Sequence, residues 1–372
     1  MHIAVRQLLA TLTVGAVVAG FAAPAQATPR SSAVAAATWQ ASQLDDHGGI
    51  HNDQYDFTDW GLTVDSVVAL KATGARPALA TKATAYVAAH VRSYNSDDYG
   101  QPGVRISGAT GKLLYLADVT GSDPRDFGGF DLRAESLALM TASGVNRGRF
   151  QDQGTTDYSN TFGQAFNILG LARSGGVPRA AVSFLTRQQC AAGGFRLDPD
   201  DAAPRCDQAA DPVLDPDSTG LSVQALLAAY RTGNKAAGTA ARKGALWLLR
   251  EQAQNGSFDG SGPTASANTN STGLAGEAIR AVGRTHLVTA DAGRRLLTGA
   301  AKAASWVRTL QLTPADATAD IGAVAYDATA LSDARRNGIT TETRDQWRRA
   351  TPQALLVLAR VSLDDIGRQR RR

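Results

Sequence analysis

A short pattern recurs along the chain and constrains its fold more than any other feature of the sequence. In each clear copy an aromatic residue begins the pattern, and a glycine-containing turn followed by an apolar residue ends it eleven positions later. Six copies spaced by roughly fifty residues are typical of a fold assembled from repeated units that bury their apolar faces against one another. The clear copies are 39–50, 184–195 and 247–258, with Gln189 and Gln252 at one shared position, and weaker or partial copies begin at Tyr86, Leu137 and Trp306 (with Gln311).

A second helical pattern lies between these copies and predicts buried helices in the intervals. Its segments are rich in Ala, Leu and Gly and carry little charge, which is typical of a helix surrounded by other helices. Thr-Gly pairs end three of them, where glycine suits a helix C-cap, and residues suited to N-caps begin them. The aligned segments are 61–65, 108–112, 220–224 and 273–277, the endings are 73–74, 120–121 and 232–233, and the expected caps are Asp59, Asn160, 217–219 and 270–272.

The alternation of amphipathic and nearly all-apolar helices predicts two concentric layers. The expected fold class is all-α: an (α/α)6 toroid of six helical-hairpin repeats, with the amphipathic helices outside and the apolar helices inside. Runs of β-branched residues that alternate with polar ones are scarce, so no extended sheet is expected. We therefore predict a single toroid domain over 28–366, followed by a basic tail at 367–372.

The stretch 243–252, followed by 255–258, closely resembles the QW motif of the prenyltransferase, squalene cyclase and terpene cyclase repeat family. Phe258 stands where that family usually has Trp. With its weaker copies the resemblance covers 31–365 and implies the toroid fold. It implies much less about activity, because the same toroid hosts cyclases, protein prenyltransferases and non-catalytic carriers such as the cobalamin-binding proteins. We interpret the aromatic residues and glutamines of the motif as structural: Trp39, Phe184, Trp247, Gln189 and Gln252.

Residues 1–27 have the features of a secretory signal peptide. Arg6 supplies the positive charge, an apolar stretch follows, and an Ala-x-Ala cleavage site ends the segment. The apolar stretch is about 16 residues long, shorter than the ~20 of a membrane-spanning helix, so we expect a secreted protein without a membrane span. In an oxidising compartment Cys190 and Cys206 should form a disulfide. The net charge of +4 is too small for a nucleic-acid binder of this length.

One segment matches the acid motif of the class II terpene cyclases in this family. There the middle residue of Asp-x-Asp-Asp protonates the substrate, and here 215–219 reads Asp-Pro-Asp-Ser-Thr, with Asp217 as the acid beside Asp215. The parallel stretch 268–272 begins a helix without any acid, so we prefer an N-cap role for Asp217. A literal Asp-Pro-Asp-Asp at 198–201 lies inside the disulfide loop, before the next helix. The aromatic content of 6% also disfavours carbocation chemistry, which uses ring faces to stabilise cations.

One turn into the inner helices, the aligned position is polar in four helices out of five. One interpretation is that each side chain bonds a neighbouring helix. The other is that they face the lumen and supply a few oriented contacts in an apolar cavity, which is how small-molecule sites are usually built. The five predicted ligand-binding residues are Asp65, Lys112, Phe166, Gln224 and Glu277.

We therefore expect a secreted, monomeric toroid that binds a small molecule or an extracellular polymer in its central cavity. No cofactor or metal is expected: His47 and His51 are four positions apart, but two glycines between them disfavour a helical metal site. One alternative is a divergent terpene-cyclase-like enzyme with Asp217 as general acid. Another is a polysaccharide lyase or hydrolase on an (α/α)6 barrel, and a third is a scaffold that presents its outer surface to partners.

Overall fold

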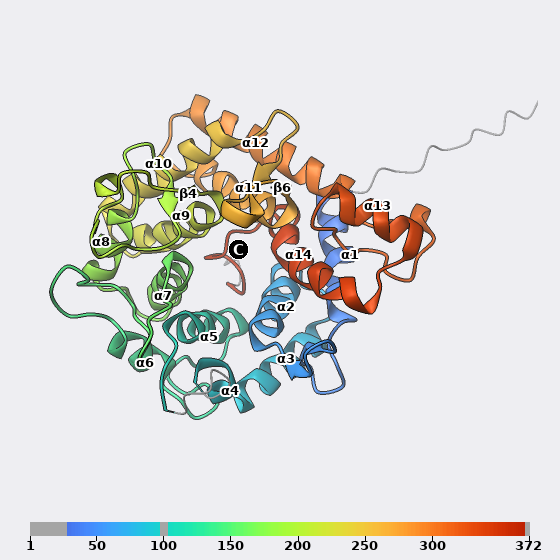
Figure 1. Cartoon of the computed structure of the whole chain (residues 1–372), viewed down its shortest axis with the longest axis horizontal. Coiled ribbons are helices and arrows are strands. Elements are labelled where there is room, and N and C mark those ends of the chain that lie inside the picture. The colour runs from blue at the N-terminus through green and yellow to red at the C-terminus, as the bar shows by residue number, and fades with distance from the viewer. Residues whose placement is uncertain (1–27, 97–102, 369–372) are drawn as a thin grey trace, which may run out of the picture.

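Six helices form a closed inner ring in the computed structural model, which describes residues 28–96 and 103–368 (Figure 1). Each packs against the next, and the last packs against the first. The expected signal peptide at 1–27 and most of the expected basic tail lie outside the described residues. The inner helices are α2 (Trp60–Thr73), α5 (Ser107–Thr120), α7 (Thr161–Arg173), α9 (Pro216–Arg231), α11 (Thr269–Gly283) and α14 (Thr341–Ala359).

Six further helices surround this ring, so the predicted (α/α)6 toroid is confirmed. The outer helices are α1 (Pro29–Ala41), α3 (Pro77–Ala89), α6 (Leu132–Ala138), α8 (Arg179–Arg187), α10 (Lys235–Glu251) and α12 (Ala290–Thr309), while α4 (Val91–Asn95) and α13 (Ala328–Asn337) lie in connections. Strands in the described residues are confined to three two-stranded antiparallel ribbons, made by β1 (His51–Asn52) with β2 (Phe57–Thr58), β3 (Phe195–Arg196) with β4 (Leu214–Asp215), and β5 (Phe258–Asp259) with β6 (Ala267–Asn268).

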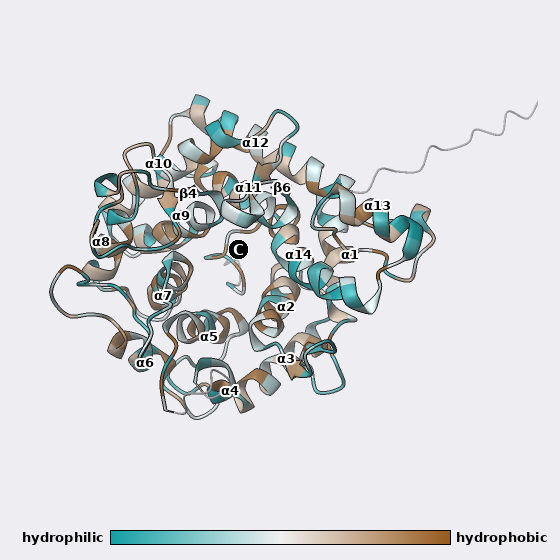
Figure 2. Ribbon diagram, viewed as in Figure 1, coloured by the Kyte–Doolittle hydropathy of each residue, from teal (hydrophilic) through white to brown (hydrophobic). Residues whose placement is uncertain are grey.

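The burial of the helices follows the sequence pattern. Every residue from Ser218 to Ala229 of α9 is buried, whereas α10 buries a single stripe and leaves its other face to solvent. The exception is α14, whose first half is mostly exposed and strongly hydrophilic, as is the neighbouring α13 (Figure 2). Its second half, from Ala350 to Leu358, is buried almost throughout and completes the ring.

All six inner helices run in the same direction. Each follows a long loop from an outer helix, and most end in a short turn to the next outer helix, such as 74–76 or 232–234. Gly74, with φ of 76°, closes α2 in the left-handed conformation that glycine adopts without strain. The toroid therefore has a loop face, at the N-terminal ends of the inner helices, and a turn face, at their C-terminal ends.

The glutamines of the repeat link neighbouring hairpins. The Nε2 of Gln189 donates to the carbonyls of Gly193 and Ala240, at 2.8 and 3.0 Å, and so joins its own turn to the next outer helix. Gln252 makes the equivalent pair of bonds. Gln311 donates to Gly322 and, at 2.9 Å, to the carbonyl of Ser32 in the first outer helix. The same bond that links successive repeats thus also joins the last repeat to the first.

The predicted disulfide between Cys190 and Cys206 is present, with its Cα atoms 4.8 Å apart. It closes the base of the loop that leads into α9. Within that loop Phe195 is fully buried, and its N–H donates to the hydroxyl of Thr219 on α9 at 2.8 Å. The loop is thus fixed at both its base and its centre.

After α14 the chain turns back into the lumen from the turn face, where residues 360–368 form what we call the C-terminal plug (Figure 1). The hydroxyl of Tyr115 donates to the carbonyl of Leu363 at 2.8 Å, and Arg173 donates to the carbonyls of Leu363 and Ile366 at 3.1 and 2.8 Å. Gly367, with φ of 75°, lies against the carbonyl of Val119, where a side chain would clash. The predicted domain thus ends in a segment that blocks the centre of its own ring.

Candidate functional site

Helix α9 begins two residues earlier than the sequence predicts, and this changes the position of Asp217 in the helix. The expected cap at 217 is wrong: Asp215 is the N-cap, and its Oδ1 accepts the N–H of Ser218 at 2.5 Å. Pro216 occupies the first helical position, where its missing N–H costs nothing. Asn268 caps α11 in the same way, two residues before the expected segment. Asp217 therefore lies inside the helix and has no capping role.

Because α9 and α11 begin earlier than expected, the five predicted ligand-binding residues lie at two different depths along the inner helices. Asp65, Lys112 and Phe166 lie six positions after their N-caps at 59, 106 and 160. Gln224 and Glu277 lie nine positions after theirs, at 215 and 268, and are therefore about one turn deeper in the lumen. The residues of α9 and α11 that share the upper level are apolar, Leu221 and Leu274.

The upper level lines a pocket on the axis of the toroid, open toward the loop face. Its volume is about 100 Å³. The Nζ of Lys112 lies 2.8 Å from Oδ1 of Asp65 and donates to the carbonyl of Gly61 at 3.0 Å, so the two charges neutralise each other. Phe166 lies beside them, with its ring centroid 5.8 Å from the Lys112 ammonium. Three of the five predicted residues thus meet in one pocket.

The other walls of this lumen pocket were not expected from the sequence. Phe162 and Tyr115 add aromatic surface, and Leu363 of the C-terminal plug forms part of the lining. Phe162 could have been found, since it lies four positions before Phe166 on the same helix face. Leu363 carries no such signal, because only the folded ring places the end of the chain there. The pocket is therefore a mostly apolar cup with one internal ion pair.

The two deeper predicted residues are occupied by internal contacts. The Oε1 of Gln224 accepts the N–H of Leu363 at 3.3 Å and so helps to hold the plug. Glu277 is fully buried and accepts bonds from Nε and Nη2 of Arg280, both at 2.7 Å. Burial raises the pKa of Glu277 to about 7, although Arg280 opposes the change. The structure does not bring these two side chains into the lumen pocket.

Asp217 lies one helical turn before Leu221, a residue of the pocket lining, on the side of the loop face, and is not itself part of the lining. It is four positions before Leu221, and therefore on the same face of α9. Its Oδ1 is buried and has no hydrogen-bond partner among the described residues. Burial, reinforced by the charge of Asp215, raises the pKa of Asp217 to about 7. The raised pKa makes this carboxyl able to hold or give up a proton near neutral pH.

Asp215 is a supporting residue by comparison. One of its oxygens is used in capping α9, and the other accepts the hydroxyl of Ser261 at 2.6 Å. Both oxygens are thus engaged in fixing the start of the helix and the loop beside it. What Asp215 contributes to the chemistry of the site is its negative charge, which raises the pKa of Asp217.

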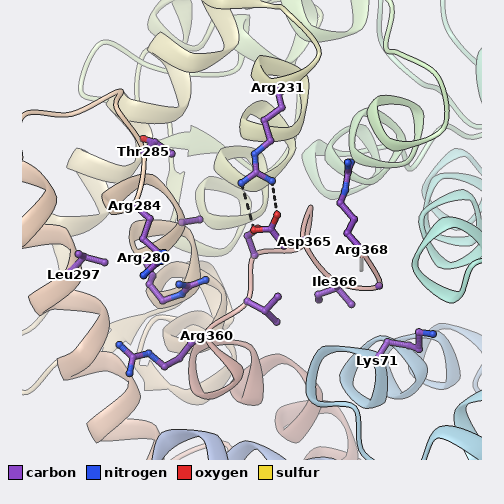
Figure 3. A pocket seen from close by; sticks show the side chains of 14 residues that line it. Lys71, Arg231, Arg280, Arg284, Thr285, Leu297, Arg360, Asp365, Ile366 and Arg368 are labelled. Carbon is purple, nitrogen blue, oxygen red and sulfur yellow. Dashed lines mark hydrogen bonds and ion pairs between the residues drawn. The ribbon is translucent and has the colours of Figure 1, made fainter. Parts of the chain in front are cut away.

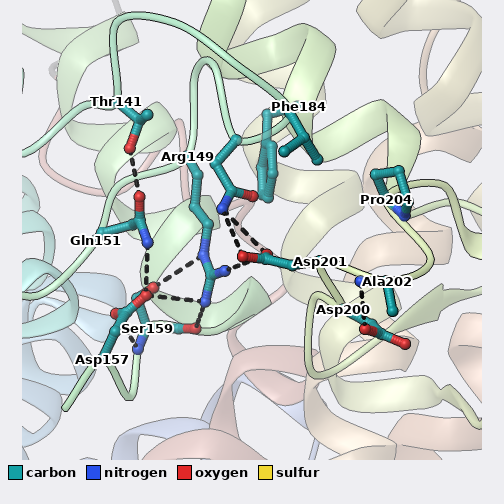
Figure 4. A network of polar contacts seen from close by, with 12 residues as sticks. Thr141, Arg149, Gln151, Asp157, Ser159, Phe184, Asp200, Asp201, Ala202 and Pro204 are labelled. Atoms are coloured by element: carbon teal, nitrogen blue, oxygen red, sulfur yellow. Dashed lines mark hydrogen bonds and ion pairs between the residues drawn. The ribbon is translucent and has the colours of Figure 1, made fainter.

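The literal acid motif at 198–201 serves the loop rather than the lumen (Figure 4). Asp201 accepts from Nη1 of Arg149 at 3.3 Å, and both its oxygens accept from the side-chain amide of Asn146 at 3.0 Å. Arg149 also donates to Ser159 and pairs with Asp157 at 3.1 Å. This network ties the disulfide loop to the loop before α7.

Large apolar side chains stand exposed on the long loops that precede the inner helices. Tyr158 is 78% exposed and Tyr55 is 68% exposed. Six of the eight large apolar residues that are exposed in the described structure belong to these loops. They come from separate loops and add apolar contact area to the loop face. The six are Tyr55, Phe57, Val145, Tyr158, Val213 and Ile321.

His47 and His51 make other contacts in the loop before α2. The ring of His47 stacks on Tyr86, and Nε2 of His51 lies 3.4 Å from Asp56. In the described residues, no group of three or more His, Cys, Asp or Glu side chains could hold a metal ion. Across the same residues, no helix has the length and apolar character needed to cross a membrane.

Known proteins resemble this chain in fold, at low sequence identity. No protein-family model matches the sequence, and no curated protein matches it. An inactive variant of the alpha-1,6-mannanase GH76A of Salegentibacter sp. HEL1_6, in complex with alpha-1,6-mannotriose, is 10% identical, with a TM-score of 0.61 over 90% of this chain and 99% of that chain. The type II terpene cyclase MstE from Scytonema is 12% identical, with a TM-score of 0.57 over 91% of this chain and 98% of that chain.

A protein from Actinoplanes is 18% identical to the chain, with a TM-score of 0.53 over 89% of this chain and 99% of that chain. Identities this low show a shared architecture and no shared activity. The chain thus has the same (α/α)6 toroid fold as a glycoside hydrolase and a terpene cyclase.

Proposed function

We propose that the protein is exported and binds an extracellular polymer of the glycan class across its loop face, with one group of the polymer inserted into the lumen pocket. The observation that carries this proposal is a small blind pocket, lined by Phe162 and Phe166, at the centre of a face with exposed aromatic side chains. The predicted signal peptide at 1–27 and the disulfide support export.

The size of the pocket favours a polymer over an engulfed small molecule. Pockets that enclose a drug-sized ligand typically have volumes of about 300–1,000 Å³, and the lumen pocket has about 100 Å³. A polyprenyl chain folded for cyclisation needs to be enclosed as a whole, so this pocket disfavours such a substrate. A polymer lying across the face needs room for a single group.

The chemistry of the walls suits a sugar ring. Phe162 and Phe166 offer apolar surface, and the Asp65–Lys112 pair offers a donor and an acceptor within the same cup. Tyr55 and Tyr158 could extend the contact along the chain, because tyrosine combines an apolar ring with a polar tip. The mannanase with the same fold was determined in complex with an oligosaccharide, which is consistent with this use of the fold.

Isothermal titration calorimetry of the mature protein with alpha-1,6-mannotriose and a panel of soluble polysaccharides tests the proposal. We expect at least one glycan to bind, and Phe166→Ala and Tyr158→Ala each to weaken it about tenfold, or about 1.4 kcal/mol. Val34→Ala, an exposed apolar residue on α1, is the control and should bind as the wild type does. Absence of binding across the panel, or binding that both loop-face variants retain, contradicts the proposal.

A second candidate function rests on Asp217. A carboxyl with a pKa near 7, a buried unpaired oxygen and a place one helical turn from the pocket lining has the properties of a general acid. In glycan hydrolysis, protonated Asp217 would donate its proton to the leaving glycosidic oxygen while water adds to the anomeric carbon and the C–O bond breaks. Release of reducing ends from a bound glycan measures this reaction. Asp217→Asn should abolish it while glycan affinity is retained.

A further inference from the structure

The turn face carries a second and larger cavity, separate from the lumen pocket. Its volume is about 710 Å³. The C-terminal plug divides the two: Leu363 faces the lumen pocket, while Ser362 and 365–368 line the cavity on the turn face. A ligand in this cavity would therefore not meet a ligand in the lumen pocket.

Six cationic side chains from four segments of the chain line this cavity (Figure 3). Asp365 is the acidic residue of the lining, so the lining residues carry a net charge of 6 − 1 = +5. Counting the nearby Asp364 and Glu277, which pair with lining arginines, the balance is 6 − 3 = +3. The six are Lys71 of α2, Arg231 of α9, Arg280 of α11 and Arg284 at its C-cap, and Arg360 and Arg368 of the plug.

Half of these cations are already paired. Arg231 pairs with Asp364 and, at 2.9 Å, with Asp365; Arg368 lies 2.8 Å from Asp364. Arg280 is held by Glu277, as described above. The other three cations, Lys71, Arg284 and Arg360, have no carboxylate within 4.0 Å among the described residues, although they line the same concave surface.

Helix electrostatics explain part of this cluster. A cation in the last turn of a helix is stabilised by the partial negative charge of the helix C-terminus, and Lys71, Arg231 and Arg280 occupy such positions. Arg360 and Arg368 follow the end of α14 and extend from the plug into the same cavity. Like charges brought together without counterions repel one another. The convergence of the plug arginines on those of α11 therefore needs an explanation beyond the helix ends.

We propose that this cavity binds a ligand through its phosphoryl groups. Guanidinium groups are planar forks that bind oxyanions by two parallel bonds. A carboxylate offers two oxygens in one plane and is satisfied by one fork, whereas a tetrahedral phosphoryl group accepts bonds from several directions. The unpaired Arg284 and Arg360 come from different segments, and together they suit such a group. The site is independent of the proposed function, since it lies on the opposite face.

Calorimetric titration of the mature protein with inorganic pyrophosphate at low ionic strength tests the site. We expect saturable binding that the double variant Arg284→Gln/Arg360→Gln weakens at least tenfold. The matched control is Arg242→Gln/Lys243→Gln on α10, which removes the same charge from an exposed outer helix and should leave the affinity within twofold. Arg284→Lys/Arg360→Lys keeps the charge without the forks, and an intermediate affinity is expected. Thermal melts confirm that each variant is folded.

A second arm separates the two sources of a phosphoryl group. Sedimentation with vesicles of phosphatidylglycerol, compared with vesicles of phosphatidylcholine, measures recognition of a lipid headgroup. Pyrophosphate binding without vesicle binding indicates a free phosphorylated ligand, and vesicle binding lost in Arg284→Gln/Arg360→Gln indicates a headgroup. The proposal is overturned if neither probe binds, or if the α10 control loses as much affinity as the cavity variant, because net charge alone would then account for binding.

Discussion

The two faces of the toroid are built from the two ends of the same six helices, yet their cavities differ in volume, in charge and in the side chains that line them. The loop face holds a small pocket with aromatic walls and one neutral ion pair, Asp65–Lys112. The turn face holds a cavity about seven times larger, lined by cations. The inner helices contribute layers of side chains to both, but long loops finish one face and the plug finishes the other. Repetition thus fixes the ring, and the non-repeated segments fix its chemistry.

Release of the C-terminal plug from the lumen should have the largest effect on the difference between the two faces. The Arg173 side chain is 1% exposed; its guanidinium pairs with Asp118 at 2.6 Å and donates to plug carbonyls. Arg173→Met should lower the free energy of unfolding by about 3–5 kcal/mol, because it leaves buried polar partners uncompensated. Urea denaturation measures the loss.

Arg250→Met is the control for this substitution. Arg250 lies on outer helix α10, is exposed, and also donates to a backbone carbonyl, that of Ala192. We expect the control to change the free energy of unfolding by no more than about 0.5 kcal/mol. Equal effects of the two substitutions would mean that the plug contributes little to the separation of the faces.

Removal of the disulfide tests whether the loop face can be altered without a change in the turn face. Replacing Cys190 and Cys206, which are separated by 16 positions, with Ser should cost roughly 3 kcal/mol of stability in the chain-entropy description. Since the bridge closes a loop-face loop, glycan binding should weaken while pyrophosphate binding is kept. Chemical denaturation and the two titrations check these outcomes together. Loss of pyrophosphate binding in the folded variant would show that the faces are coupled.

The smallest expected effect concerns Asp217, whose pKa is raised above its unfolded value. For an acid this means that the charged form is disfavoured in the folded state, so the cost is absent below about pH 4 and complete above about pH 7. Asp217→Asn should therefore match the wild type at pH 4 and be more stable by about 1–2 kcal/mol at pH 8, a reduced figure because the side chain is partly exposed.

Thermal melts across that pH range measure the difference. Asp46→Asn, at an exposed loop position, should differ little from the wild type at either end of the range. A constant difference between Asp217→Asn and the wild type from pH 4 to pH 8 would contradict the raised pKa. The loop-face acid would then be an ordinary surface carboxylate.

The fold was predictable from the sequence because its determinants are local and repeated. The Gln189 and Gln252 positions, the Thr-Gly endings and the apolar helices each recur, so that one copy supports the next. The site was predictable in part. Asp65, Lys112 and Phe166 line one pocket, while the Asp65–Lys112 pair also joins neighbouring helices, as the other interpretation expected. The alignment of α9 and α11 was displaced by their earlier starts at Pro216 and Thr269. In both helices a side chain two residues before the expected cap, Asp215 or Asn268, accepts a first-turn N–H and so begins the helix earlier.

The plug was not predictable, for a physical reason. The bonds that Tyr115 and Arg173 make to the plug are with backbone carbonyls, at 363, 364 and 366, and any sequence offers those. The specificity lies in the partners, Tyr115 and Arg173, which are about two hundred positions away in the chain. Buried polar side chains on apolar inner helices were the available signal, and their partners could not be named without the ring.

The bond from Gln311 to Ser32 has a consequence for the order in which the molecule is completed. Synthesis begins at the N-terminus, so α1 appears long before α12 and α14, which pack against it in the closed ring. The first helix must wait for the last hairpin, and the plug can seat only when the ring has closed around it. A chain truncated before α14 would therefore leave the inner ring open between α11 and α2.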